Sequence, residues 1–551
     1  MRRTHYLTIP CGLLLVGTVL WAGCGKTQSD CVGGLGTCAA LIQGGGGSTS
    51  SSTMTTASGT MASSSTGMDP TCDGEISEEM SEDDRDRLIS DKCGVFVRAD
   101  ATGPVENGTQ AAPYRSLQTA IDDAKGNKRV YACAKAPYAE ALTIAVPTAM
   151  YGGFKCDQGW VWKAATRSLI TGAAPNVTLT LTTQAEGARI EGFKITSASA
   201  TGQTGESSIA VAVDAIQAEL VACDVEAGAG ADGIDGVTPA GTVTKGMDAP
   251  PAFASNACVA MNQVIGGDPG TTTCSDGTTA GGVGGTGGIT GMSSGNGQPG
   301  MDGTPMDAVD GHGGAGESAA SCKEGVPGKP GEPGPAGVPN LAPGELSLSG
   351  VLSPEGSDGQ PGFSGHGGGG GGGAKAGVFC KLGASTIDGV GASGGGGGAG
   401  GCGGKGGGGG KAGGSSIAIV SLGTKLQLTK VTLTSGKGGN GGKGAIGQGG
   451  GVFGDGAKGG LASGFAGSSA GCKGGDGGKG GDGGTGAGGR GGHSLGLAVL
   501  GSLVMSAVTL PGTPGEGGVA GMGGTNGSKG LGGTNDTACW DFSTNSACPT
   551  K

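Results

Sequence analysis

Three stretches of this 551-residue chain share one pattern and decide the predicted fold: SSIAVAVDAIQAELVACDVEAGAG (207–230), SSIAIVSLGTKLQLTKVTLTSG (415–436) and HSLGLAVLGSLVMSAVTLPG (493–512). Each stretch begins with a run of small apolar residues, passes through a turn into a second alternating strand, and then enters glycine-rich sequence. Two short strands cannot bury their inward face alone. The units are therefore expected to stack on one another around a core of Ile, Val, Leu and Ala.

The chain from residue 94 to 265 has a similar character and is predicted to be regular β-structure. Short β-type runs, among them 130–132, 142–144 and 188–190, recur about every 8 to 12 residues with turn residues between them. Four apolar residues follow helical spacing instead: Leu117, Ala120, Ile121 and Ala124. They predict a short helix whose single apolar face covers a larger structure.

The stretches GTQAAPYRSLQTAIDDA (108–124) and RVYACAKAPYAEALTIAVPTAMYGGF (129–154) resemble the start of right-handed parallel β-helix proteins of the pectate-lyase-like superfamily. The resemblance is strongest to secreted glycine-rich lipoproteins of the kind found in myxobacteria, and it covers residues 94–236. It implies an all-β fold, a right-handed parallel β-helix with an N-terminal capping helix and long glycine-rich loop insertions. Because this fold hosts lyases, hydrolases, adhesins and proteins without known activity, the resemblance implies no single function.

The N-terminal sequence MRRTHYLTIPCGLLLVGTVLWAGC predicts export. Two arginines precede an apolar run that is too short to span a membrane comfortably, so residues 1–23 are predicted to be a signal peptide. The tripeptide ending at Cys24 resembles the lipobox of bacterial lipoproteins, which implies lipidation of Cys24 and anchoring at the outer membrane or cell surface. Plain secretion, with Cys24 in a disulfide, is the alternative. Residues 24–70 are rich in Gly, Ser and Thr and are expected to form a flexible tether.

The chain contains 17 cysteines, which indicate disulfides rather than a metal site. It has no C-x-x-C motif and only four histidines, so neither a metal nor a cofactor is expected. Disulfides in an oxidising compartment fit the cysteine count better, although the sequence leaves their connectivity open. The closest candidate pairs are Cys72 with Cys93, Cys133 with Cys156, and Cys539 with Cys548. Cys72 and Cys93 enclose an acidic segment (71–93), which is expected to be a solvated helix or loop.

Glycine accounts for 133 of the 551 residues, far above the average usage of roughly 7%. Residues 266–551 are predicted to be β-helix coils interrupted by glycine-rich excursions and followed by a Cys-containing tail. In KGGDGGKGGDGGT (473–485), the other residues fall at every third position. This period matches an extended helix with three residues per turn, whose bare edges permit lateral backbone hydrogen bonding.

Two structures are open for these glycine-rich stretches. They either pack side by side as a bundle or remain flexible linkers, because ordering glycine carries a large entropy cost. The collagen-like block GVPGKPGEPGPAGVP (325–339) is too short for a stable triple helix and is expected to be a local extended segment.

The sequence favours a protein without catalytic activity and assigns no catalytic residue. The tripeptides around His312 and His366 match a Gly-His-Gly turn of galacturonan hydrolases, but almost any histidine in glycine-rich sequence would produce that match. Asp214 and Asp224 are single acids on different expected strands. The paired acids and nearby base that a polysaccharide lyase or hydrolase requires are therefore not indicated.

Charge gives a weak indication of a partner. The chain has a formal net charge of -11, while its last 150 or so residues carry more Lys and Arg than acids. Four lysines are candidates for contact with acidic glycans, with simple solvation as the alternative: Lys437, Lys443, Lys473 and Lys479. Nucleic acid is not expected, given the acidity and the few aromatic residues.

The composite prediction is a non-catalytic cell-envelope surface protein with a structural or adhesive role, in contact with the membrane through its lipid. A polysaccharide lyase or hydrolase of the β-helix fold is the alternative, a passive spacer is a third interpretation, and the oligomeric state is left open.

Overall fold

The computed structural model describes residues 70–173, 177–214, 217–251, 254–259, 264–423, 425–501, 523, 529, 531–536 and 539–548. All of them belong to one compact unit, residues 63–551. The predicted signal peptide, the candidate lipidation site Cys24, the tether as far as residue 69, and the second strand expected in 493–512 lie outside the described residues. Neither α-helix of the described chain has the length and apolar character needed to cross a bilayer.

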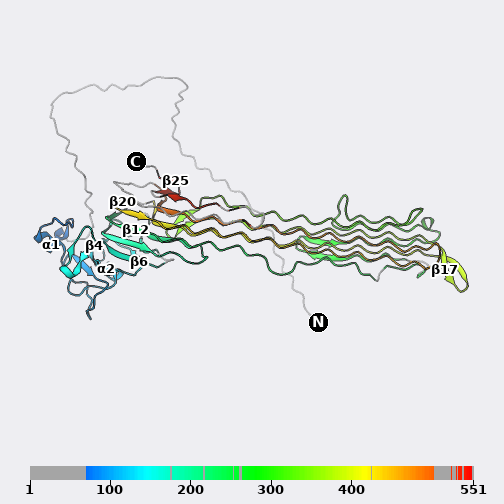
Figure 1. Ribbon diagram of the computed structural model, residues 1–551, viewed down its shortest axis with the longest axis horizontal. Coiled ribbons are helices and arrows are strands. Elements are labelled where there is room, and N and C mark those ends of the chain that lie inside the picture. The colour runs from blue at the N-terminus through cyan, green and yellow to red at the C-terminus, as the bar shows by residue number, and fades with distance from the viewer. Residues whose placement is uncertain are drawn as a thin grey trace, which may run out of the picture. The chain divides into compact units, whose positions relative to one another are not determined.

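Three sheets of mainly parallel strands form the base of this unit (Figure 1). The first sheet has the order β1 (Gly94–Val97), β2 (Arg129–Cys133), β4 (Ala149–Lys155), β8 (Ala188–Glu191), β11 (Gln217–Val221) and β20 (Lys425–Thr429), with β5 (Val161–Trp162) antiparallel to β4. The second sheet has the order β3 (Leu142–Ile144), β7 (Leu179–Leu181), β10 (Ser208–Asp214), β19 (Ser416–Leu422), β22 (Ser494–Val499), β24 (Trp540–Asp541) and β25 (Ser546–Ala547), and β23 (Asn535–Asp536) also pairs with β22. The third sheet is β6 (Ser168–Gly172), β9 (Phe193–Ser197), β12 (Asp224–Glu226) and β21 (Thr432–Thr434).

Parallel pairing in register places like side chains above one another. Leu220 of β11 lies opposite Ile190 of β8 on one side and Leu428 of β20 on the other. These residues belong to one buried cluster that draws on all three sheets. Full burial of each such side chain contributes about 1.5–3 kcal/mol. Columns of aliphatic side chains thus form the core between the sheets.

Two α-helices flank the first strands. Helix α1 (Glu82–Leu88) lies in the acidic segment, and the Ser81 side chain accepts a hydrogen bond from the Asp84 amide at its N-terminus. Helix α2 (Leu117–Ala124) is the helix that the apolar spacing predicts, and the four residues of that spacing are its buried face. Three 3-10 turns lie at Pro70–Cys72, Cys156–Gln158 and Ser293–Gly295.

The glycine-rich stretches form an ordered bundle, so the alternative of flexible linkers is wrong for the described residues. We call this the glycine bundle, and its segments are 227–249, 264–288, 297–317, 325–338, 356–376, 391–414, 436–460 and 471–492. Figure 1 shows the glycine bundle extending from the sheets to the hairpin of β17 (Gly377–Leu382) and β18 (Ser385–Gly389). Two further hairpins leave the bundle, β13 (Thr271–Cys274) with β14 (Gly277–Ala280), and β15 (Glu345–Ser347) with β16 (Gly350–Leu352).

Backbone hydrogen bonds hold neighbouring segments together at every third residue. The amides of Gly395, Gly398 and Gly401 donate to the carbonyls of Cys472, Gly475 and Gly478, each across 3.0 Å. This spacing is the one expected of extended helices with three residues per turn. The collagen-like block is one such segment, because the amides of Gly325 and Gly328 donate to Lys473 and Asp476.

The predicted fold class is wrong. The described chain is a mixed, α/β-like arrangement of several mostly parallel sheets with two α-helices, and not an all-β right-handed parallel β-helix. The physical reason lies between β12 and β19, where the chain leaves the three sheets. Glycine-rich sequence there has no side chains to fill a sheet core, and it pairs backbone to backbone in the bundle instead. Within the described part of 266–551, the predicted β-helix coils are therefore wrong: the chain there forms the glycine bundle, three antiparallel hairpins, and the strands β19 to β25 that extend the sheets.

Candidate functional site

At its closest backbone contacts, the interior of the glycine bundle admits no side chain. A Cβ atom added at Gly370 would lie 2.0 Å from the carbonyl oxygen of Val283, although real Cβ contacts essentially never fall below 3.0 Å. The backbone of Gly370 itself is fully bonded, with its amide 2.8 Å from the Met301 carbonyl and its carbonyl 2.8 Å from the Gly314 amide. Close approach of neighbouring backbones, and not an unusual backbone angle, is what requires glycine here.

The run from Gly367 to Gly373 is the most enclosed part of the bundle. Its amides donate in turn to three neighbouring segments, at Thr304, Gly398 and Val326 for the first three residues. Its carbonyls accept from Gly282, Gly314 and Gly475, among others. Thr304 and Gly314 lie on the two arms of one segment (297–317), so six stretches of chain from five segments surround this run, which leaves no edge for a side chain. Around this run the bundle is consequently held by backbone hydrogen bonds, and the few buried side chains of its segments are small ones such as Ala399 and Ala487.

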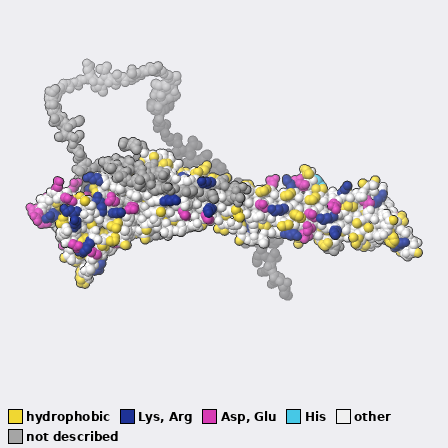
Figure 2. Space-filling model, in the orientation of Figure 1, with side chains coloured by type: hydrophobic (Ala, Val, Ile, Leu, Met, Phe, Trp, Pro, Cys, Tyr) yellow, Lys and Arg dark blue, Asp and Glu magenta, His cyan; other side chains and the backbone are white. Residues whose placement is uncertain are grey.

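The outer residues of the segments carry the charges. Figure 2 shows basic and acidic side chains mixed along the visible face of the bundle. Two of the four candidate lysines are neutralised by an aspartate three residues along the same segment. Lys473 Nζ lies 2.8 Å from Asp476, and Lys479 Nζ lies 2.9 Å from Asp482. Both i,i+3 pairs lie at the surface, where each contributes about 0–1 kcal/mol.

The other two candidate lysines are exposed and form no ion pair within the described part of the chain. They are not in purely basic surroundings, however. The Lys443 amide donates to Asp235 Oδ1 across 2.7 Å, and the Asn440 amide donates to Asp232 Oδ1 across 2.6 Å. The acids of segment 227–249 therefore line the same edge as Lys437 and Lys443.

Aspartates on the outside of the bundle accept hydrogen bonds from backbone amides of the next segment. Asp482 accepts from Gly450, Asp302 from Gly313 and Asp248 from Asp455, each across 2.8 Å. These backbone amides hold the pKa of all three carboxyls below the ordinary value, with help from Lys479 at Asp482, His312 at Asp302 and Lys245 at Asp248. The ionised carboxylates thus satisfy amides that face outward, where no further segment is present.

Disulfides join all three pairs that the sequence suggests: Cys72 with Cys93, Cys133 with Cys156, and Cys539 with Cys548. Three more, which sequence reasoning did not pair, tie together the segments of the glycine bundle and its adjoining hairpins and loops: Cys258 with Cys380, Cys274 with Cys402, and Cys322 with Cys472. These join residues 122 to 150 positions apart, so no local spacing signalled them. Cys223 is the free cysteine of the described chain, and burial raises the pKa of its thiol to about 12.

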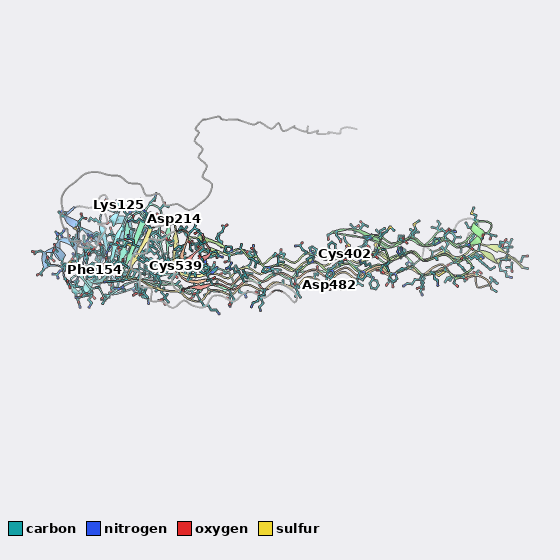
Figure 3. The ribbon with its side chains drawn as sticks, turned by 90° about the horizontal axis from the view of Figure 1, so that it is seen from above. Lys125, Phe154, Asp214, Cys402, Asp482 and Cys539 are labelled. Carbon is teal, nitrogen blue, oxygen red and sulfur yellow. A yellow bond between two sulfur atoms is a disulfide. The ribbon has the colours of Figure 1, made fainter. Side chains whose placement is uncertain are left out.

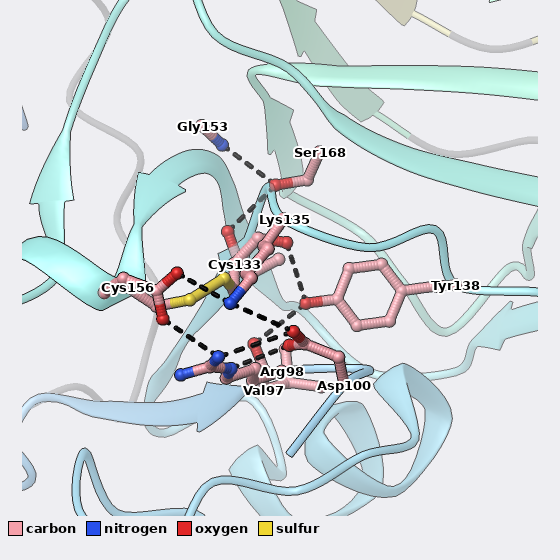
Figure 4. Close-up of a disulfide and its surroundings, with 11 residues drawn as sticks. Val97, Arg98, Asp100, Cys133, Lys135, Tyr138, Gly153, Cys156 and Ser168 are labelled. Carbon is pink, nitrogen blue, oxygen red and sulfur yellow. Dashed lines mark hydrogen bonds and ion pairs between the residues drawn. A yellow bond between two sulfur atoms is a disulfide. The ribbon is translucent and has the colours of Figure 1, made fainter.

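A ring of four charges lies beside the Cys133–Cys156 disulfide (Figure 4). Arg98 lies 2.7 Å from Asp100 and 2.9 Å from Asp157, while Lys135 lies 3.5 Å from Asp100 and 2.8 Å from Asp157. Hydrogen bonds from Arg98 and Lys135 lower the pKa of Asp100 and Asp157 respectively. Two cations and two anions satisfy one another here, so the ring fits a structural role better than the capture of a charged ligand.

The residues weighed for catalysis are not brought together. Asp214 ends β10 in the second sheet and Asp224 begins β12 in the third. His312 and His366 lie in the glycine bundle. Figure 3 shows that the bundle, marked by Cys402 and Asp482, is well separated along the molecule from the sheets, where Asp214 lies. Within the described chain, no group of three or more His, Cys, Asp or Glu side chains is placed to hold a metal ion.

The end of the glycine bundle exposes apolar side chains that the sequence did not mark as functional. Val378 and Leu382 of the β17–β18 hairpin are 64% and 68% exposed, and Phe465 of a neighbouring loop is 44% exposed. Lys381 Nζ lies 5.2 Å from the centre of the Phe465 ring. Beneath them, Phe379 is buried in a small apolar cluster with Ala374 and Ala392. A compact support thus holds the exposed apolar residues at the end of the bundle.

No protein-family model, curated protein or solved structure matches the chain. The resemblance to pectate-lyase-like proteins therefore stays a prediction from the sequence.

Proposed function

We propose that this protein is a non-catalytic surface protein with a structural or adhesive role, in which the glycine bundle holds its apolar end away from the sheets. The observation that carries the proposal is the continuous lateral hydrogen bonding of the bundle. The segments are bonded to their neighbours at every third residue, and three disulfides tie the segments, hairpins and connecting loops of this region to one another. Such construction favours a stiff element over a mobile linker.

Export and lipid anchoring at Cys24 are part of the proposal. The six disulfides of the described chain are compatible with an oxidising compartment. Contact with acidic glycans is assigned to Lys437 and Lys443, because Lys473 and Lys479 are already paired with aspartates.

Adhesion of beads coated with the full chain tests this function. Beads carrying the unaltered protein are expected to retain acidic polysaccharides, such as polygalacturonate and alginate, without releasing products. The variant Gly370→Ala should lose retention, because its Cβ cannot fit between segments. Gly449→Ala is the matched control, since a Cβ there meets only Asp482 Oδ1 at 3.8 Å.

The lysine assignment has its own pair of variants. Lys437→Gln combined with Lys443→Gln should weaken retention of acidic polymers, whereas Lys479→Gln, at an already paired position, should change it little. Release of unsaturated uronic acids or of new reducing ends by the purified protein would replace the proposal with an enzymatic function. Equal retention by the Gly370→Ala and Gly449→Ala beads would show that adhesion does not depend on the bundle.

A further inference from the structure

A pocket of about 280 Å³ lies on the glycine bundle beneath the β13–β14 hairpin. Residues from four separate parts of the chain form it. They are Asp276–Thr279 of the hairpin, Pro305, the stretch Lys329–Glu332, and Phe363, Ser364 and His366. The volume is near the lower limit of about 300 Å³ for small-molecule sites, so it suits one ring rather than several.

The pocket is held in place by covalent and polar contacts. The Cys274–Cys402 disulfide ties the hairpin to a neighbouring bundle segment. At the hairpin turn, the Asp276 carboxylate accepts hydrogen bonds from the amide of Ser364, across 2.8 Å, and from its hydroxyl. The backbone beneath is fixed as well, because the amides of Phe363 and His366 donate to the carbonyls of Glu332 and Lys329. The walls are therefore preformed.

The lining combines apolar rings with polar groups. Pro305, Pro330 and the half-exposed ring of Phe363 present apolar surface. Asp276, Lys329 and Glu332 present charges, and the half-buried His366 contributes an imidazole, of which the Nδ1 atom is buried and has no hydrogen-bond partner among the described residues.

This mixture suits a sugar ring. The C–H face of a pyranose can lie against Phe363 and the proline rings, while its hydroxyls meet the carboxylates and the imidazole. Lys329 is already 3.4 Å from Asp307. Among the pocket residues, the carboxylates Asp276 and Glu332 outnumber the single ammonium group of Lys329. This excess of negative charge disfavours a uronic acid.

We infer that this pocket binds a single non-acidic pyranose unit. The inference rests on the proposed adhesive function and deepens it, because it gives the protein a glycan site distinct from the exposed lysines.

Saturation-transfer NMR on the full chain tests the inference, with N-acetylglucosamine, galactose, glucose and galacturonate as separate probes. At least one of the three non-acidic sugars should bind saturably and more strongly than galacturonate. Phe363→Ala should weaken that binding about two- to tenfold, the loss expected for one aromatic contact. Val452→Ala is the matched control, because Val452 is also an outward bundle residue, 57% exposed against 54% for Phe363, and lies outside the pocket.

Glu332→Gln supplies a second readout. Removing its charge should narrow the preference for non-acidic sugars over galacturonate, an effect that a purely structural role would not produce. Absence of saturable binding, stronger binding of galacturonate, or equal loss in Phe363→Ala and Val452→Ala would overturn the inference. If any of these results is obtained but the coated beads still retain polysaccharide, only the pocket inference is refuted and the adhesive function stands. If the beads do not retain polysaccharide but the protein still binds the monosaccharide, only the adhesive function is refuted.

Discussion

Replacing Gly370 by alanine should open the centre of the glycine bundle while leaving the sheets folded. The new Cβ would start 2.0 Å from the Val283 carbonyl oxygen and needs at least 3.0 Å, so the segment carrying Val283 must move by at least 1 Å. Three of the hydrogen bonds that hold that segment at this point, each of 2.8 Å, are stretched beyond useful length by such a shift. They join Gly282 to Gly368, Gly285 to Gly371, and Met301 to Val283.

The expected cost follows from these bonds. Each contributes a net of about 0.5–1.5 kcal/mol, so losing three destabilises the bundle by about 1.5–4.5 kcal/mol. Amide exchange in segments 282–288 and 365–373 should accelerate by about one to three powers of ten. Peptides from β8 and β11, in the first sheet, should exchange as in the unaltered protein.

Gly449→Ala provides the comparison within the same bundle. Its Cβ meets open space, so the substitution should be neutral or stabilise by up to about 1 kcal/mol through the unfolded chain. Hydrogen exchange read by mass spectrometry, with both variants and the unaltered full chain side by side, measures the difference. If Gly370→Ala and Gly449→Ala exchange alike in 365–373, then close backbone approach is not what requires glycine in the interior.

Three further predictions concern the surface, the disulfides and the free thiol. The pKa values of Asp248, Asp302 and Asp482 are lowered in the folded protein. The stability that these carboxylates contribute is therefore complete above the unfolded carboxyl pKa of about 3.9 and is lost as the pH falls through the lower folded values. Thermal unfolding followed from pH 6 to pH 2 should show this loss of stability, and the decrease should be smaller in a variant with all three residues replaced by Asn. Replacing Cys274 and Cys402 by alanine removes a disulfide that, with Cys258–Cys380 intact, closes a loop of about 38 residues (16 from 258 to 274 and 22 from 380 to 402), and should destabilise by about 4 kcal/mol in the chain-entropy model. The nine-residue loop of Cys539 and Cys548 should cost roughly 2.5 kcal/mol. Denaturant unfolding under oxidising conditions measures both, and a larger loss for the shorter loop would contradict the model. Cys223 is buried and the pKa of its thiol is raised to about 12. Iodoacetamide at pH 8 should therefore leave the Cys223 peptide unmodified in the folded protein and label it in guanidinium. Rapid labelling of the folded protein would show that the core around Cys223 opens readily.

Local pattern predicted local structure well in this chain. The spacing of Leu117, Ala120, Ile121 and Ala124 gives the helix and its buried face, because a helix of two turns depends on its own residues and one packing surface. The shared SSIA motif likewise belongs to strands that pair, with Ser208 opposite Ser416 and Ile209 opposite Ile417. The repeated strand units were a poor guide to fold class. They predict further coils of the same kind in the glycine-rich sequence between them, but that sequence has no side chains to fill a sheet core.

The sugar pocket could not be found from the sequence. Asp276, Glu332 and Phe363 come from segments up to 87 positions apart, as their numbers show. These residues are brought together only by the order in which the bundle segments lie side by side. Glycine-rich segments have almost no side chains that would indicate, from the sequence, which segments become neighbours. For the same reason the cross-linking pairs Cys258–Cys380 and Cys322–Cys472 had no sequence signal.

Glycine content within a segment does, however, report how many neighbours that segment has. The uninterrupted run 367–373 bonds to six stretches of chain from five segments and has no outward edge. Stretch 473–485 has two glycines per triplet, and its third positions, such as Asp476 and Lys479, are less buried than the glycines between them. In the collagen-like block, with one glycine per triplet for most of its length, only Gly325, Gly328 and Gly337 are buried, and the remaining positions are partly or fully exposed. Three residues per turn give three edges, and each edge pressed against backbone demands glycine, so the count of glycines per triplet ranks segments from centre to surface. By this reasoning, a substitution is tolerated according to the edge it occupies and not according to how glycine-rich its surroundings are.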